Sequence, residues 1–361
     1  MSKQFQRGLI VGKFSPLHRG HELVVNRAFE RCDEVAIISY SNPEFPGCEA
    51  EKREKWLAAS FPKARCLVVT HERLRMILKN APIHEIPPND ADDPTHRRFV
   101  GFLCTQIEFR PDAVFTSEDY GDGFARELTS YFRQYAAGTS AVQHVLVDKE
   151  RTRIPISGTA LRNDIHGHRQ WLSPVVYASF VRRVCLLGGE SSGKSTLAEA
   201  LAKTFHTVHV PEYGRELWER RNGQLSYDDL LHIGERQVAD EEEALFRANR
   251  FLFCDTSPLT TLFYCEHLFG SAEPGLHELA NRAYDLVVLC GTDFAFVQDG
   301  TRQQPKFRDL QHAWYLAEFE RRRTPFVLAT GSVSDRIAQI SNVLLNSFNR
   351  PRLTPSVNTE H

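Results

Sequence analysis

The chain has 361 residues, of which 42% are hydrophobic, and a formal net charge of −2. This length predicts two domains, and the near-neutral charge gives no electrostatic basis for binding nucleic acids or membranes. Because no amino-terminal stretch has the pattern of a signal peptide and no apolar run approaches the ~20 residues of a membrane helix, we expect a cytoplasmic protein.

The eight cysteines lie far apart without a Cys-x-x-Cys pair, which predicts reduced thiols rather than a disulfide framework. His166 and His168 flank a glycine, but no cysteine accompanies them at metal-ligand spacing. We therefore expect this histidine pair in a surface loop.

The first distinctive stretch joins an apolar run to an amphipathic helix that begins near His21. Gly12 and Gly20 allow the backbone to pass close to a ligand, and His18 and His21 stand three positions apart where the helix starts. Free N–H groups and the positive end of the helix dipole favour an anion there. The stretch predicts a triphosphate-binding turn, unless the two histidines only cap the helix.

Strand-like runs alternate with helical stretches over the first half of the chain, which is typical of a parallel sheet with crossover helices. The runs cover residues 9–11, 35–39, 67–69, 113–116 and 142–147. Ligands bind at the carboxyl edge of such sheets, where the first helix would place His21. A second helix is predicted over residues 49–60, in which Arg53 either points toward the same cleft or is a solvated charge.

Two later segments of this half lack regular periodicity. Residues 81–96 are rich in Pro, Asn and Asp, which predicts a surface excursion. Residues 116–121 leave the fourth strand and bring Tyr120 and the flexible Gly121 to the sheet edge. Tyr120 is either a nucleotide contact or a packed ring.

Residues 156–162 offer a Ser or Thr helix cap, small residues for close approach, and Arg162 one helical turn in. The N–H groups at such a helix start, together with Arg162, would bind phosphates opposite the histidines.

The pattern G-x-F-x-P-x-H-x-G-H at residues 12–21 resembles the signature of the nucleotidylyltransferase superfamily, specifically of nicotinamide mononucleotide adenylyltransferases. Residues 156–162 match the second superfamily signature, I-S-x-T-x-x-R, so the resemblance covers residues 5–175. It implies that Lys13, His18, His21 and Arg162 act in catalysis. The implied ATP contacts are Gly12, Phe14, Gly20, Ser157 and Thr159, and the implied substrate contacts are Tyr120 and Gly121.

An apolar strand-like run at residues 184–187 precedes the motif G-x-x-x-x-G-K-[ST] at residues 188–195. In such a P-loop, backbone N–H groups form an anion nest, Lys194 reaches the β- and γ-phosphates, and Ser195 binds magnesium. The predicted ATP contacts are Gly188, Gly189, Glu190, Ser191, Ser192, Gly193, Ser195 and Thr196.

Four further strand-like runs, at residues 208–211, 251–254, 286–289 and 326–329, predict a second parallel sheet. Two of them end in a carboxylate. Glu212 lies where nucleoside kinases place the group that accepts the 5′-hydroxyl proton, and Tyr213 beside it is a predicted substrate contact. Asp255 is suited to bind either magnesium or the ribose. Either carboxylate could instead cap the next element, and the sequence does not rank them as the kinase base.

Residues 298–308 form a basic, turn-rich loop that includes Arg302 and Arg308. The loop either closes as a lid over the transferred phosphoryl group, where both arginines would contact substrate, or is a solvated charge run. Disorder is predicted from about residue 350 onward.

An adenylyltransferase domain (residues 1–181) followed by a P-loop kinase domain (residues 182–361) resembles the bifunctional NadR family. The resemblance implies an α/β chain with two doubly wound parallel sheets. It also implies that the kinase phosphorylates nicotinamide riboside with ATP and Mg²⁺, and that the transferase joins the mononucleotide to AMP, giving NAD and pyrophosphate. Some family members begin with a helix-turn-helix repressor domain, but here the first strand starts near residue 8, so repression is not implied.

Two alternatives remain. A fused phosphopantetheine adenylyltransferase and dephospho-coenzyme A kinase would share both architectures, although residues 16–21 fit the nicotinamide branch better. A sensor that binds these nucleotides without turnover is disfavoured by the intact His18, His21, Lys194 and Ser195. The sequence leaves open a homo-oligomer, the relative rates and feedback by NAD.

Overall fold

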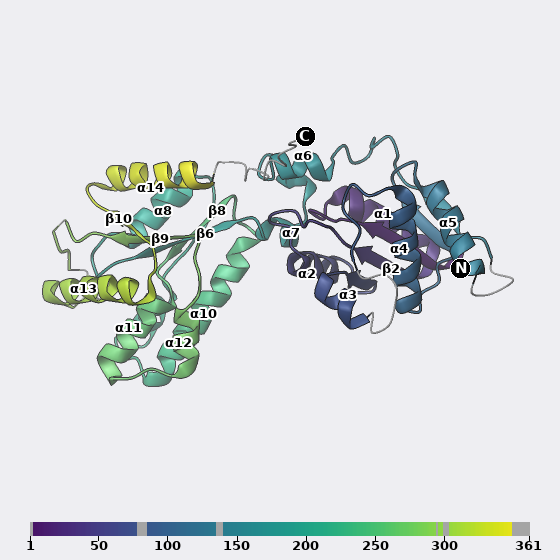
Figure 1. Cartoon of the computed structure of the whole chain (residues 1–361). Helices are drawn as coiled ribbons and strands as arrows, with labels where there is room; N and C mark the ends of the chain where they lie inside the picture. Colours follow the sequence, from purple (N-terminus) through teal and green to yellow (C-terminus); the bar gives the residue numbers. More distant parts are fainter. Residues whose placement is uncertain (1–2, 78–84, 135–139, 294, 299–302, 349–361) are drawn as a thin grey trace, which may run out of the picture. The chain divides into compact units, whose positions relative to one another are not determined.

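The computed structural model describes residues 3–77, 85–134, 140–293, 295–298 and 303–348. The chain divides into two compact units, Met1–Ser179 and Phe180–His361 (Figure 1). This division lies two residues before the predicted domain boundary at 181/182. Each unit holds one five-stranded parallel sheet with helices around it.

The sheet of the first unit has the strand order β3-β2-β1-β4-β5, and every pair is parallel. Its strands are β1 (Phe5–Gly12), β2 (Cys32–Ser39), β3 (Arg65–Val68), β4 (Ala113–Thr116) and β5 (Gln143–Leu146). The central residue Leu9 pairs with Ala36 on one side and with Val114 on the other. The strand order reverses between β1 and β4, where doubly wound sheets bind ligands.

The helical elements of this unit are α1 (Arg19–Arg31), α2 (Ala50–Ser60), α3 (His71–Ile77), α4 (Asp93–Gln106), α5 (Gly121–Arg133), α6 (Gly158–Asn163), the 3₁₀ turn η1 (Arg169–Trp171) and α7 (Pro174–Ala178). The predicted excursion at residues 81–96 is wrong at its end, because α4 begins there. Asp92 caps that helix by accepting a hydrogen bond from the backbone N–H of Thr95. Residues 78–84 lie outside the described ranges.

The sheet of the second unit has the order β10-β9-β6-β8-β7, again all parallel. Its strands are β6 (Arg182–Leu187), β7 (His209–Val210), β8 (Phe251–Asp255), β9 (Leu286–Cys290) and β10 (Val327–Ala329). Its helices are α8 (Lys194–Thr204), α9 (Tyr213–Arg220), α10 (Tyr227–Leu245), α11 (Pro258–Phe269), α12 (Pro274–Ala280), α13 (Pro305–Arg322) and α14 (Val333–Phe348). The predicted α/β class with two doubly wound parallel sheets is confirmed.

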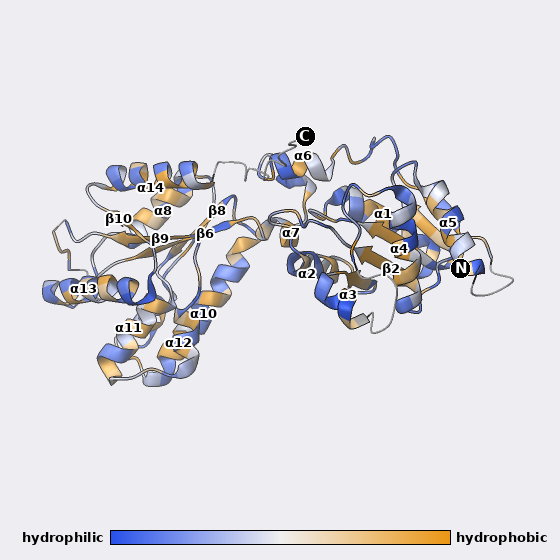
Figure 2. Cartoon of the chain, in the orientation of Figure 1, coloured by the Kyte–Doolittle hydropathy of each residue, from blue (hydrophilic) through white to orange (hydrophobic). Residues whose placement is uncertain are grey.

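The central strand β6 is buried on both faces. Val184 and Leu186 join the core under α8 and α14, whereas the alternate residues Cys185 and Leu187 join the core under α10, α11 and α13. Figure 2 shows the strands of this sheet as mostly hydrophobic, although β6 begins with Arg182 and Arg183. Such continuous apolar runs are typical of parallel strands with helices on both sides.

Two composition-based expectations can be compared with the described residues. All eight cysteines lie within them as free thiols, seven buried and Cys66 exposed. No described helix combines the length and apolar character needed to span a bilayer.

Arg53 is neither solvated nor in the cleft, so both interpretations of this residue are wrong. It is fully buried in α2, and its guanidinium donates to the Cys48 carbonyl oxygen at 3.0 Å and to Ser39 Oγ at 2.7 Å, and pairs with Glu44 at 2.5 Å. These bonds connect the end of β2 to the loop that leads into α2. Charge in a buried position is tolerated here because the donors are partnered.

Replacing Arg53 by alanine should lower the free energy of unfolding of the first unit by about 2–4 kcal/mol, because acceptors on β2 and the following loop lose charged hydrogen bonds. Urea unfolding followed by the fluorescence of neighbouring Trp56 measures this. The matched control, Lys55→Ala on the exposed face of α2, should change it by less than about 0.5 kcal/mol. Equal effects of the two substitutions would contradict the structural role of Arg53.

Candidate functional site

The first candidate site is a cleft of about 580 Å³ at the carboxyl ends of β1 and β4. This is the position at which the strand order reverses. Its lining includes Gly12, Lys13, Phe14, Ser15, His21, Tyr40, Phe45, Asn89, His96, Glu118, Tyr120, Arg151, Ser157, Thr159 and Arg162. Both signature motifs of the first half, 147 residues apart at Ser15 and Arg162, thus meet in one cavity.

His18 and His21 form a stacked pair at the start of α1. Nδ1 of His18 accepts a hydrogen bond from the Gly20 N–H at 3.1 Å, which caps the helix. The rings lie 3.8 Å apart, and His21 lines the cleft while His18 is buried against it. Gly20 is required for this packing, since a Cβ there would lie 2.9 Å from the His18 ring.

Both histidines are neutral near pH 7. Burial, followed by the charge of Arg151, lowers the pKa of His18 to about 4. Burial, then His18 and Arg151, lowers the pKa of His21 well below its ordinary value. Because Nδ1 of His18 accepts a hydrogen bond, the proton of the neutral ring is on Nε2. His21 Nδ1 is buried and has no hydrogen-bond partner in the described part of the chain.

Lys13 and Arg162 bring two cations to the same cleft. The Arg162 guanidinium donates to the Ser15 carbonyl oxygen at 2.6 Å and to Thr159 Oγ1 at 3.0 Å. Lys13 Nζ donates to the Asn89 carbonyl oxygen at 3.3 Å, and burial together with the Arg162 charge lowers the Lys13 pKa. A lysine whose pKa is lowered by burial and by a neighbouring cation indicates a place built for an anion, which would relieve the repulsion.

The start of α6 faces these cations. Ser157 is its N-cap, and its hydroxyl accepts a hydrogen bond from the Ala160 N–H at 3.1 Å. Gly158 lies close to Arg162 Nη1, which a Cβ at this position would meet at 3.2 Å. The capped helix start and the guanidinium are therefore adjacent, as the sequence predicts.

Tyr120 and Gly121 differ in their roles. Tyr120 lines the cleft with 38% of its surface exposed. Gly121 is not among the lining residues and starts α5, where a Cβ would lie 2.0 Å from His144 Nε2. The described role of the glycine is a close approach to His144, whose Nε2 lies 2.8 Å from Thr116 Oγ1, and its expected substrate contact stays a prediction.

Several residues of the cleft were not predicted from the sequence. Phe45 stacks on the Arg162 guanidinium at 4.0 Å, and the Tyr40 hydroxyl lies 3.0 Å from His96 Nδ1. A signal for Phe45 did exist, because it lies between two prolines in the loop that leaves a predicted parallel strand, and such loops face the ligand edge.

The second candidate site begins at the P-loop between β6 and α8. Gly193 has φ +81°, and Lys194 Nζ donates to the carbonyl oxygens of Gly188 at 3.0 Å and Gly189 at 3.2 Å. The Glu190 carboxylate accepts hydrogen bonds from the Tyr264 hydroxyl at 3.0 Å and from the Gln303 N–H at 2.7 Å. The loop is thereby held to α11 and to the approach to α13.

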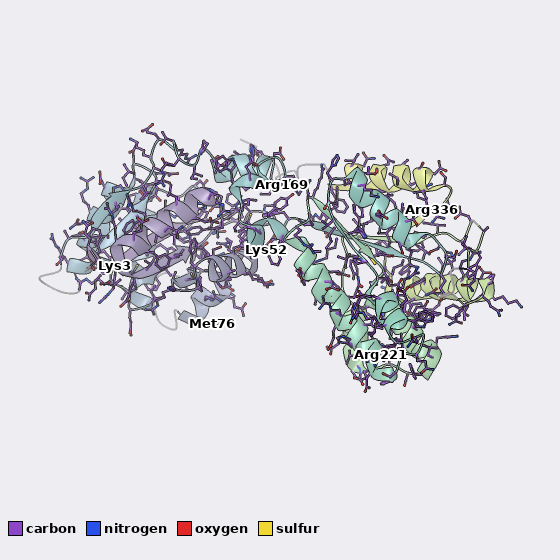
Figure 3. The ribbon with its side chains drawn as sticks, turned by 180° about the vertical axis from the view of Figure 1, so that it is seen from behind. Lys3, Lys52, Met76, Arg169, Arg221 and Arg336 are labelled. Carbon is purple, nitrogen blue, oxygen red and sulfur yellow. The ribbon has the colours of Figure 1, made fainter. Side chains whose placement is uncertain are left out.

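Arg336 supports the same loop and was not foreseen from the sequence. It is buried in α14 (Figure 3). Its guanidinium donates to the carbonyl oxygens of Ser192 at 2.8 Å and Gly291 at 3.1 Å, and pairs with Asp293 at 2.6 Å. One arginine therefore joins the P-loop to the end of β9.

Glu212 and Asp255 have different surroundings. Asp255 is buried at the end of β8 and accepts a hydrogen bond from the Ser195 hydroxyl, and burial raises its pKa against the opposing charge of Lys194. Glu212 instead lines a cavity of about 580 Å³ beside Lys194. Burial raises its pKa as well, with Lys194 opposing and Asp255 adding to the rise.

The cavity beside Glu212 is polar at the P-loop and apolar farther away. Its lining includes Glu190, Lys194, Glu212, Gly214, Arg215, Trp218, Leu225, Leu230, Ile233, Gln237, Thr256, Thr260, Tyr264, Phe269 and Gln311. A cavity with aromatic walls and a carboxylate near a phosphate-binding loop suits a nucleoside.

Tyr213 is not among these lining residues, and its predicted substrate contact stays a prediction. Its hydroxyl lies 3.2 Å from His232 Nε2, and its ring lies 5.9 Å from the Arg236 guanidinium. The turn of α9 directs Gly214 and Trp218, four positions apart, into the cavity and Tyr213 away from it. Trp218 is the aromatic side chain of α9 that lines the cavity.

Arg308 is not part of a lid loop. It lies in the first turn of α13 and is buried, and a Cβ at Gly189 would lie 2.6 Å from the Arg308 carbonyl oxygen. The lid interpretation is wrong for this residue, because α13 packs its backbone on the P-loop. Arg302 and the tail from residue 350 lie outside the described residues.

The described residues contain no group of three or more His, Cys, Asp or Glu side chains arranged to hold a metal ion. Magnesium does not need one, because it is commonly bound by one or two protein oxygens plus phosphate and water oxygens. Ser195 and Asp255 provide such a pair, and Asp255 Oδ1 is buried without a hydrogen-bond partner in the described part of the chain. The donors present therefore fit Mg²⁺.

Comparison with known proteins supports both halves of this description. Residues 9–164 match the cytidylyltransferase-like family, and residues 183–336 match the AAA domain family. Over 318 residues, which are 83% of this chain and 72% of the relative, the sequence is 31% identical to the trifunctional NAD biosynthesis/regulator protein NadR of Salmonella typhimurium. The chain belongs to the NadR family.

The NadR protein of Escherichia coli is 30% identical over 311 residues, covering 82% of this chain and 71% of that protein. Two crystal structures of NadR, one in complex with NAD and AMP-PNP and one in complex with NR, each cover 95% of this chain. They match with TM-scores of 0.65 and 0.67, at 19% and 20% identity, over 97% and 96% of their own chains. The two-sheet architecture is thus the NadR fold, and the predicted family is confirmed.

Proposed function

We propose that this chain is a bifunctional enzyme of NAD biosynthesis. One site phosphorylates nicotinamide riboside with ATP, and the other transfers AMP from ATP to nicotinamide mononucleotide, giving NAD and pyrophosphate. The observation that carries the proposal is the presence of two separate phosphate-binding clefts in a chain of the NadR family. The product of the first reaction is a substrate of the second.

In the adenylyl transfer, the mononucleotide phosphate attacks the α-phosphorus of ATP in line, and pyrophosphate leaves. Lys13 and Arg162 neutralise charge that develops on the phosphate oxygens, while the neutral rings of His18 and His21 donate hydrogen bonds. The described geometry supports these roles, because both cations and His21 line one cleft. The protein contributes position and charge without a covalent intermediate.

In the kinase reaction, Glu212 accepts the proton of the riboside 5′-hydroxyl as that oxygen attacks the γ-phosphorus of ATP. Glu212 lines the cavity, which favours Glu212 over Asp255 as the base, because Asp255 accepts a hydrogen bond from Ser195 instead. Lys194 holds the β- and γ-phosphates. Mg²⁺, held by Ser195 and Asp255, would neutralise charge on the same phosphates.

The two alternatives are less well supported. Membership in the NadR family favours the nicotinamide substrates over coenzyme A precursors. A sensor without turnover needs no carboxylate beside the P-loop, and Glu212 and Asp255 both lie there. We propose a cytoplasmic location, where ATP is available and thiols stay reduced.

Purified chain incubated with magnesium ATP and nicotinamide riboside should form the mononucleotide first and NAD afterwards. Chromatographic separation of the products at successive times measures this. If the riboside stays unreacted while dephospho-coenzyme A is phosphorylated, the coenzyme A alternative replaces the proposal. Binding of all substrates without any product would indicate the sensor.

A further inference from the structure

A buried amide in the kinase cavity has no function in the scheme above. Gln237, on α10, is 1% exposed and lines the cavity. Its Oε1 accepts a hydrogen bond from the Tyr213 backbone N–H at 3.3 Å. Its Nε2 is buried and has no hydrogen-bond partner among the described residues. A buried donor without an acceptor is costly, so such groups are rare unless a ligand supplies the partner.

The bond to Tyr213 places Gln237 along the cavity. Tyr213 directly follows Glu212, the carboxylate proposed to accept the 5′-hydroxyl proton, so the Gln237 amide lies at the Glu212 end. Ile233 and Leu230 line the cavity one and two turns earlier on α10, respectively. The helix face therefore passes from apolar side chains to one polar side chain as it approaches Glu212.

This order matches the parts of a pyridine riboside. A flat ring suits the apolar end, which includes Trp218 and Phe269, and the sugar must lie near the group that accepts its 5′-hydroxyl proton. Because Oε1 is already held by a backbone N–H, the amide presents its NH₂ group as a donor. In a riboside bound in this order, the sugar hydroxyl oxygens would be the acceptors nearest to that NH₂ group.

We propose that Gln237 binds the substrate of the kinase by donating a hydrogen bond from Nε2 to the 2′- or 3′-hydroxyl oxygen of the ribose. The inference rests on the proposed riboside kinase activity and adds a sugar-recognition residue to it. A substrate that lacks the bound hydroxyl would leave the buried amide unpaired. The site therefore selects ribosides over the corresponding deoxyribosides.

The first test uses the parent chain. Nicotinamide riboside and its 2′-deoxy and 3′-deoxy analogues are compared in steady-state kinase assays at saturating ATP. We expect one of the two analogues to show a KM about 10- to 100-fold higher than the riboside, because the donor loses its acceptor. Equal KM values for all three substrates would overturn the proposal.

The second test uses two substitutions. Gln237→Met removes both hydrogen-bonding groups, whereas Gln237→Glu keeps an acceptor for the Tyr213 N–H and removes only the NH₂ donor. Both should raise the riboside KM about 10- to 100-fold and abolish discrimination against the deoxy analogue, with the KM for ATP and the adenylyl transfer unchanged. Glu235→Gln, at an exposed position of the same helix, is the matched control.

A purely structural role would instead lower kinase activity and thermal stability without changing the preference between riboside and deoxyriboside. That result would overturn the proposal. The proposal would also be overturned if the variants changed only the preference between nicotinamide riboside and nicotinic acid riboside. That result would place the amide at the ring substituent rather than at the sugar. If the parent chain does not phosphorylate nicotinamide riboside at all, the proposed function fails first, and the two failures are distinguishable.

Discussion

Lys194→Ala should phosphorylate nicotinamide riboside about 10²- to 10³-fold more slowly than the parent chain, because one preorganised cation is lost where charge develops on the transferred phosphoryl group. The side chain also donates to the carbonyls of Gly188 and Gly189, but the P-loop keeps its support from Arg336. The rate of mononucleotide formation at saturating substrates measures the effect. Lys203→Ala, at an exposed position of the same helix, is the control and should retain the parent rate.

The same Lys194→Ala variant should convert supplied mononucleotide to NAD at nearly the parent rate. His21→Ala should do the reverse, accumulating mononucleotide from riboside with little NAD. This variant is preferable to His18→Ala, which also removes the cap of α1. Mixing the two variants should restore NAD formation from riboside, since the intermediate can diffuse between molecules. Loss of both activities in either folded variant would contradict two separate sites.

Glu212→Gln should reduce the kinase turnover number by about 10²- to 10⁴-fold, the usual contribution of a general base. Burial raises the pKa of Glu212, and only the ionised form accepts a proton. The kinase rate of the parent chain should therefore decline as the pH falls through that raised pKa, at a higher pH than for an ordinary glutamate. The acidic decline should be absent from the residual activity of the variant.

Asp255→Asn is the comparison that separates the two carboxylates. The Asp255 carboxylate is hydrogen-bonded to Ser195 and is proposed to hold Mg²⁺ with it. Loss of this carboxylate should therefore raise the magnesium concentration needed for the half-maximal rate. The acidic decline should persist in this variant. If Asp255→Asn abolishes the decline and Glu212→Gln does not, the two roles are reversed.

Local signals account for the part of the fold that the sequence predicts well. Apolar runs predicted all ten strands of the described residues to within a few residues, and the glycine spacing at 188–195 predicted the turn before α8. Cys32 shows the limit of this reasoning, because it continues the apolar stripe of α1 and yet begins β2. Burial by neighbouring elements, rather than periodicity, decides such boundaries.

Contacts between distant segments account for what was missed. Trp218 and Tyr213 both follow Glu212, and only the rotation of α9 determines which one reaches the cavity. Arg336 lies 144 residues from the Ser192 carbonyl that it supports. Arg53 has the spacing of an exposed helix charge, and its burial depends on acceptors in the preceding strand and loop.

The contacts of Arg336 have a consequence for the order in which the chain matures during synthesis. Every described element of the first unit precedes residue 180, so the ribosome releases a complete transferase fold while the kinase is still being made. The P-loop is synthesised soon afterwards, but Arg336 in α14 follows it by more than a hundred residues. We therefore expect a nascent chain to be able to use the mononucleotide before it can produce it.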